Sequence, residues 1–217
     1  MIGANLLRYN KEQIYMVVDV ETEGLNLVHS RPFQLSYVKF NLGNILERKN
    51  YYLWWPDFQI SEGAARVTQF NYNLYKSQAE DPKKVLEELE AYLYDPSIKV
   101  VSHNWLGFDC KIINVIRRHL GMKIYYDYLY QEYKVYDTLA LSRARKSDLK
   151  PDTSSSLNFL AWQRRMLTNR DVKGCSLGAM VKDLKMKIDE SKLHDSMYDT
   201  EINAELFKEY VWSMELI

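Results

Sequence analysis

Two carboxylates separated by one residue stand at the end of a short apolar run near the start of the chain. Residues 14–20 are apolar and rich in β-branched side chains, which predicts a buried strand, and the two-residue period of a strand turns Asp19 and Glu21 to the same face. Neighbouring acids repel each other and resist burial, so a divalent cation held between them explains the pair. A strand running into a solvated acidic turn explains it equally well, and this stretch alone does not decide.

Two further acids fall at the ends of predicted elements. Asp109 follows a strand predicted over residues 98–102 and stands at the start of the next helix. Asp199 lies near the start of a last helix, predicted over residues 195–212, and His194 precedes it by five residues. Taken singly, each has an ordinary explanation: Asp109 as a helix cap, Asp199 as a solvated helix residue and His194 as a surface histidine.

The strands that must position these acids form a mixed pattern. Residues 32–40 alternate apolar and polar side chains, Gly43 and Asn44 mark a turn, and residues 45–53 continue as a strand rich in tyrosine. With the opening strand these make an antiparallel meander, and residues 134–137 give a fifth strand after the one over residues 98–102. A meander followed by alternating helices and strands predicts a mixed α/β sheet flanked by helices.

Several helices are predicted from caps and apolar spacing. Asp81 and Pro82 form an N-cap and a first helical residue, and Gly121 is placed as a C-cap. Residues 60–73 have no clean period and indicate a loop with one short helix, and polar residues 147–156 indicate a surface loop. Besides the helix that starts at Pro82, we expect helices over residues 110–120, 157–167, 177–184 and 195–212.

The order of the motifs is more specific than any one of them. A D-x-E strand end, a Phe-Asp pair at a strand-to-helix junction and an H-x-x-x-x-D interval follow one another over residues 19–199. This pattern resembles the DEDD superfamily of 3′-5′ exonucleases, in particular its histidine-bearing, DnaQ-like branch. The resemblance implies a ribonuclease H-like fold, a mixed five-stranded α/β sheet flanked by helices, in a single exonuclease domain over residues 1–217.

The resemblance also implies an activity and its cofactors. The activity is metal-dependent 3′-5′ hydrolysis of single-stranded nucleic acid ends to nucleoside 5′-monophosphates by a two-metal-ion mechanism, with two Mg²⁺ or Mn²⁺. Hard cations prefer oxygen ligands, and an imidazole accepts a proton near neutral pH, which suits His194 as general base. Five helical residues turn through about 140°, so we place His194 in the loop before the helix. The implied metal ligands are Asp19, Glu21, Asp109 and Asp199.

Substrate contacts are implied beside the first two motifs. The residues that match are Thr22, Gly24, Leu25, Asn26 and Phe108. Trp105 is either a base-stacking residue or a core aromatic, and the basic cluster of Arg143, Arg145 and Lys146 is either a nucleic-acid contact or a solvated helix face.

The chain departs from the family pattern in two places. One residue more than usual separates His103 and Asn104 from Phe108, which speaks against a role of His103 and Asn104 at the substrate, and Ser196 stands where alanine is usual. Asp137 and Thr138 match a frequent pair of unassigned role, and His29, His103 and His119 are interpreted as structural.

Composition limits the classes of function. The 217 residues carry 29 basic and 29 acidic side chains, which speaks against a long nucleic-acid wrap held by bulk charge. Two distant cysteines favour neither a disulfide framework nor a zinc site, and we expect a cytoplasmic protein with no membrane association.

The implied partners are single-stranded DNA or RNA 3′ ends, and a polymerase or another nucleic-acid-processing protein. The sequence gives no basis for the oligomeric state, or for choosing between DNA and RNA. An RNA-trimming enzyme or oligoribonuclease of the same branch, and a non-catalytic binding or assembly module with this fold, are the alternatives.

Overall fold

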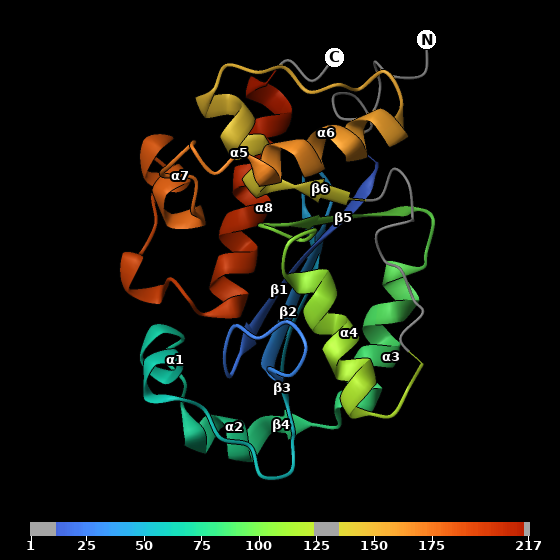
Figure 1. Ribbon diagram of the computed structural model, residues 1–217, viewed down its shortest axis with the longest axis vertical. Coiled ribbons are helices and arrows are strands. Elements are labelled where there is room, and N and C mark those ends of the chain that lie inside the picture. Colours follow the sequence, from blue (N-terminus) through green and yellow to red (C-terminus); the bar gives the residue numbers. More distant parts are fainter. Residues whose placement is uncertain (1–11, 124–134, 215–217) are drawn as a thin grey trace.

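The computed structural model describes residues 12–123 and 135–214, and its centre is one twisted mixed sheet with the strand order β4-β3-β2-β1-β5-β6 (Figure 1). β1, β2 and β3 form the predicted antiparallel meander, whereas β5 lies parallel to β1 and β6 parallel to β5. The strands are β1 (Ile14–Thr22), β2 (Pro32–Phe40), β3 (Ile45–Leu53), β4 (Ala79–Glu80), β5 (Ile98–Ser102) and β6 (Val135–Asp137).

All five predicted strands are present, and Lys134, the first residue expected in the fifth strand, lies outside the described residues. The expected strand number was wrong because β4 adds a sixth, parallel to β3. This strand has only two residues, too few to show a period in the sequence, and it exists because β3 presents an edge beside it.

Helices cover both faces of the sheet. They are α1 (Glu62–Val67), α2 (Tyr72–Gln78), α3 (Pro82–Leu93), α4 (Asp109–His119), α5 (Thr138–Lys146), α6 (Ser156–Thr168), α7 (Leu177–Asp183) and α8 (Ser196–Ser213), with a short 3₁₀ turn η2 (Glu190–Lys192) before α8. α5 was not predicted, and the region expected to hold one short helix holds both α1 and α2. Among the described helices, none is both long and apolar enough to cross a membrane.

Side chains along β1 point alternately to the two faces of the sheet, and the hydrophobic core is divided accordingly into two halves. Met16 and Val18 pack with α3 and α4 on one face, whereas Tyr15 and Val17 pack with α5, α6 and α8 on the other. In Figure 1, α3 and α4 lie on one side of the strands, and α5 and α8 on the other. Because Asp19 continues the series of Tyr15 and Val17, its side chain is directed to the α8 face.

The predicted caps explain where the helices begin and end. Asp81 accepts the backbone N–H of Lys83 at 2.9 Å with Pro82 as the first residue of α3, and Ser176 caps α7. Gly121 follows the C-cap of α4 at φ +66°, a conformation that a side chain would strain. These local signals were read correctly from the sequence.

At the outer edge of β6, a side chain instead of another strand forms hydrogen bonds with the backbone groups. Gln163 of α6 accepts the backbone N–H of Asp137 at 2.7 Å through Oε1, and its Nε2 donates to the carbonyl oxygen of Val135 at 3.0 Å. The Gln163 side chain is 1% exposed. It therefore takes the place of a neighbouring strand and fixes β6, and with it Asp137, in the sheet.

We expect Gln163→Leu to lower the free energy of unfolding by about 2 to 4 kcal/mol, because it leaves a buried N–H and a buried C=O without partners. Urea unfolding of the metal-free protein measures the loss. Gln78→Leu, at an exposed position of α2, is the control and should change stability by less than about 0.5 kcal/mol. Equal stabilities of the two variants would show that the edge of β6 does not depend on Gln163.

Candidate active site

The predicted acids meet at one edge of the sheet. β1 and β5 are parallel, so their carboxyl ends lie together; β1 brings Asp19 and Glu21, and the chain leaving β5 brings Asp109 as the first residue of α4. Asp199 comes from the first turn of α8. The hydroxyl of Ser196 donates to the carbonyl oxygen of Asp19 at 3.0 Å and fixes the start of α8 to β1.

Three side chains form the tightest cluster among the described residues. Glu21, His194 and Asp199 each place a potential ligand atom within 4.8 Å of the others. Asp19 and Asp109 lie outside this group of three. Even so, the charges of Glu21, Asp109 and Asp199 raise the pKa of Asp19, and those of Asp199 and Asp109 raise the pKa of Glu21. The four carboxylates therefore share one electrostatic site.

Asp109 does not cap α4. The N-cap position is occupied by Phe108, which makes no side-chain cap bond, and the Asp109 carboxylate accepts the hydroxyl of Ser102 at 2.7 Å. The side chain is 3% exposed, so the ordinary explanation as a helix cap was wrong. This buried carboxylate lies at the end of β5, beside the other acids.

Burial raises the pKa values of all four acids. Desolvation is the largest cause in each case: it raises the pKa of Glu21 to about 8, of Asp109 to about 7 and of Asp199 to about 6. The pKa of Asp19 is raised well above its ordinary value by burial and then by the charges of Glu21, Asp109 and Asp199. Without a counter-charge, this site holds protons near neutral pH.

The site fits divalent cations held by oxygen ligands. Asp19 Oδ2 and Asp199 Oδ1 are buried and have no hydrogen-bond partner within the described residues. A buried carboxylate oxygen without a donor is costly, and a hard cation with carboxylate ligands removes that cost. The donor set is all carboxylate apart from His194, as expected for magnesium or manganese chemistry.

His194 lies in the loop before α8, as predicted. It is exposed, and its backbone has φ +71°, in the left-handed region that non-glycine residues seldom adopt. Its N–H donates to Asp199 Oδ2 at 3.2 Å. This bond ties the histidine to the carboxylate that follows it by five residues and explains the H-x-x-x-x-D interval physically.

A cavity of about 600 Å³ opens beside the acids. Its lining includes Glu21, Thr22 and Gly24 of the first motif, Phe108 and His194, and residues of α1. The lining is mainly apolar, and the volume is within the range of about 300–1,000 Å³ that small-ligand pockets occupy. Leu25 stands at its edge and is 85% exposed.

The other predicted contacts fall in different places. Asn26 is exposed, but its carboxamide accepts the N–H groups of Val28 and His29, so it shapes the turn after β1. Trp105 is completely buried in the core beside α4, which excludes base stacking by this residue. Among the other histidines, His119 bonds the backbone of His29.

Two parts of the site were missed from the sequence. α1 and its two cap residues contribute Ser61, Gly63, Ala64, Val67 and Thr68 to the cavity, although this stretch shows no clean period. Asp137 is completely buried and accepts backbone N–H groups from Asn104, Leu106, Leu139 and Ala140. The frequent Asp-Thr pair thus ties the loop after β5 to α5, and no local signal shows that long-range role.

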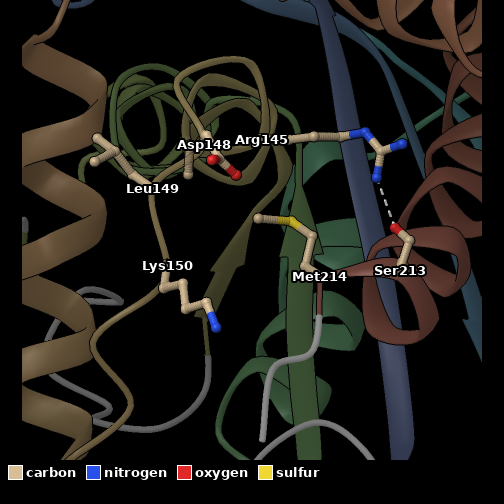
Figure 2. A pocket seen from close by; sticks show the side chains of 7 residues that line it. Arg145, Asp148, Leu149, Lys150, Ser213 and Met214 are labelled. Atoms are coloured by element: carbon tan, nitrogen blue, oxygen red, sulfur yellow. Dashed lines mark hydrogen bonds between the residues drawn. The ribbon is translucent and has the colours of Figure 1, made fainter.

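A second hollow, of about 390 Å³, lies at the far end of α8 (Figure 2). It is lined by Arg145 and Lys150 together with Met214, which is 15 residues beyond Asp199, or roughly 20 Å along a helix. Figure 2 shows Arg145 turned to the hydroxyl of Ser213, which it reaches at 2.8 Å. Arg143 donates to the last carbonyls of α6, so this basic cluster serves α5, α6 and α8 and lies away from the acids.

Comparison with known proteins supports this description of the fold. E. coli exonuclease I, in its zinc-bound form with single-stranded DNA, superposes with a TM-score of 0.69 at 17% identity over 90% of this chain and 40% of that chain. The complex of the same enzyme with a dT13 oligonucleotide gives 0.68 at 18% identity. The chain has the fold of E. coli exonuclease I.

Sequence relatives point in the same direction. DNA polymerase III PolC-type of Halalkalibacterium halodurans is 27% identical over 204 residues, 89% of this chain, and that of Staphylococcus saprophyticus is 25% identical over 207 residues, 95% of this chain. The match spans only 13% of the length of the first relative and 12% of the length of the second. No protein-family model matches it.

The raised pKa values predict how stability depends on pH and metal. Because the folded acids hold protons up to about pH 8, whereas unfolded carboxyls release them near pH 4, these groups stabilise the metal-free fold most in acid. That contribution is lost as pH rises toward about 8. We therefore expect the Tm in EDTA to fall between about pH 5 and pH 8, and Mg²⁺ to raise the Tm more at pH 8 than at pH 5.

The Tm of the wild type and of Asp19→Asn is measured by thermal unfolding, in EDTA and in millimolar Mg²⁺, between about pH 5 and pH 8. The variant removes one of the repelling charges and should unfold at a higher temperature in EDTA at about pH 8, with a smaller gain from Mg²⁺. A wild-type Tm that is independent of both pH and Mg²⁺ over this range would contradict the assignment of the acids.

Proposed function

We propose that this chain is a metal-dependent 3′-5′ exonuclease that hydrolyses single-stranded DNA ends to nucleoside 5′-monophosphates. The observation that carries the proposal is the convergence of four carboxylates and His194, from β1, α4, α8 and the loop before α8, beside a cavity of about 600 Å³. We also propose that residues 1–217 act as one exonuclease domain.

The proposed metal ligands are Asp19, Glu21, Asp109 and Asp199, which we infer hold two Mg²⁺ or Mn²⁺. When bound, such a pair lowers the pKa of water and neutralises the charge of a phosphodiester transition state. His194, at the edge of the acidic cluster, accepts the proton of the attacking water through its imidazole. Asp199 also orients the His194 backbone through the bond to its N–H.

The apolar cavity serves as the pocket for the terminal nucleoside. Phe108 and the exposed side chain of Leu25 offer apolar surface to a base, and Thr22 and Gly24 line the same cavity with Glu21. Aromatic and apolar contacts accept any base, which suits stepwise degradation without sequence preference. Asn26 acts indirectly in this proposal, by shaping the turn that presents Leu25.

DNA is preferred to RNA as the substrate on the basis of the relatives. The structural neighbour is described with single-stranded DNA, and the sequence relatives are named as DNA polymerases. The same relatives support a polymerase as a partner. An oligoribonuclease remains the second candidate of this branch, whereas a non-catalytic module does not explain the two buried carboxylate oxygens without hydrogen-bond donors.

The direction of degradation is tested with a linear single-stranded DNA and a circular DNA of the same sequence. A 5′-labelled single strand should shorten stepwise from its 3′ end in Mg²⁺, because the cavity accepts one terminal nucleoside, and EDTA should stop the reaction. The same strand closed into a circle is the control and should persist. Comparable cutting of the circle would identify an endonuclease, and faster degradation of a matched RNA would favour the oligoribonuclease.

Two conservative variants separate the proposed metal ligands from the proposed base. Asp199→Asn should lose both Mn²⁺ binding and cleavage, because the amide offers the ion a neutral oxygen. His194→Gln should keep Mn²⁺ binding and lose about two to four orders of magnitude in kcat, the usual contribution of a general base. Calorimetric titration with Mn²⁺ and single-turnover rates give the two readouts.

The same two measurements can contradict the proposed roles of Asp199 and His194. Near-wild-type turnover of Asp199→Asn would remove the metal assignment. A His194→Gln protein that loses Mn²⁺ affinity as fully as Asp199→Asn would make His194 a ligand instead of the base.

A further inference from the structure

The segment between β3 and β4, residues 54–78, forms an arm along one side of the cavity. Its base is held by rings: Phe58 stacks on Tyr75 with centroids 4.9 Å apart, and Phe70 packs against both. By contrast, α1 buries none of its residues. The position of α1 over the cavity is therefore not fixed by a core of its own.

Gln69 connects this arm to the loop that carries His194. Its Nε2 donates to the carbonyl oxygen of Ser191 at 2.8 Å and to that of Leu193 at 3.2 Å, across 122 and 124 residues of sequence. Only the amide nitrogen can bond two carbonyl oxygens, so the chemistry fixes the orientation of the carboxamide. The second acceptor belongs to the residue directly before His194.

The backbone is held in an uncommon conformation at Gln69 and at His194. Gln69 has φ +53° and His194 has φ +71°, and each is a strained conformation that surrounding contacts must maintain. The N–H of His194 is held by Asp199 from the α8 side, whereas Gln69 holds the preceding carbonyls from the arm side. The loop is thus fixed from two directions.

Empty space on both sides gives the loop room to move. His194 lines the 600 Å³ cavity under α1 and also a second cavity of about 400 Å³, which is formed with α7 and includes Leu193 and Asp199. The 3₁₀ turn at the start of the loop buries no residue. The hydrogen bonds from Gln69 and to Asp199 therefore hold the His194 loop between these two cavities.

We infer that Gln69 is a positioning residue that holds the His194 loop against the arm and keeps the imidazole at the acidic cluster. This inference deepens the proposed exonuclease function and rests on it for its effect on catalysis. The clamp itself is a structural property that can be measured without activity. Gln69 contacts neither substrate nor metal in this proposal and acts through His194.

The test compares Gln69→Ala, which removes both bonds, with Gln69→Glu, whose carboxylate repels the two carbonyl oxygens. Gln78→Ala is the matched control, since Gln78 is an exposed glutamine of the same arm with no side-chain hydrogen bond shown within the described residues. Hydrogen exchange of the metal-free proteins reports on residues 188–196, and cleavage of 5′-labelled single-stranded DNA in Mg²⁺ gives kcat and KM.

We expect both Gln69 variants to exchange several-fold faster over residues 188–196, with unchanged exchange in the sheet. Their kcat should fall about ten- to a hundredfold, the usual loss when a supporting contact is removed, with KM changed much less, and Gln69→Glu should be at least as impaired as Gln69→Ala. Gln78→Ala should match wild type in both measurements.

Unchanged exchange over residues 188–196 in Gln69→Ala overturns the inference, whatever the activity. Faster exchange throughout the arm and a lowered Tm would make Gln69 an ordinary structural residue and also overturn it. A wild-type protein without metal-dependent cleavage refutes the proposed function instead, because the exchange result still decides whether the clamp exists.

Discussion

The repulsion among the carboxylates at the carboxyl end of β1 is the constraint on which the rest of this structure depends. Asp19, Glu21, Asp109 and Asp199 share a partly buried edge. Burial raises the pKa of each, and the charges of other members of this group raise the pKa values of Asp19 and Glu21 further. A chain that gathers like charges in this way must hold them by other bonds. Here the hydroxyls of Ser102 and Ser196 do so, one on a carboxylate and one on the backbone of β1.

The sheet and its helices supply the rigidity that such a site requires. The helices that carry two of the acids pack into different halves of the core, α4 in one and α8 in the other, so both are fixed to the sheet on opposite faces of β1. Asp137 extends this rigidity to the loop after β5, because its buried carboxylate accepts two N–H groups of that loop while capping α5. Its pKa, raised by burial to about 6, is kept from rising further by those bonds.

The walls of the cavity contrast with this rigid floor. Neither α1 nor η2 buries a residue, so both depend on polar contacts at their ends. Elements with few buried contacts open at the lowest free energy in a protein. The proposed exonuclease activity requires a strand end to enter and leave between these walls. We therefore interpret the structure as a fixed acidic edge under adjustable walls, with Gln69 and Asp199 setting the closed position of the loop that carries His194.

The sequence by itself determined the features that depend on neighbours along the chain. The period of β1 placed Asp19 and Glu21 on one face, Asp81 and Gly121 marked helix ends, and the order of the acids indicated the exonuclease fold. Only the tertiary structure decided that Trp105 belongs to the core and that α5 and β4 form. The clamp from Gln69 to Leu193 joins residues 124 positions apart, and no local pattern encodes it, because the two segments become neighbours only once the sheet has assembled around β1.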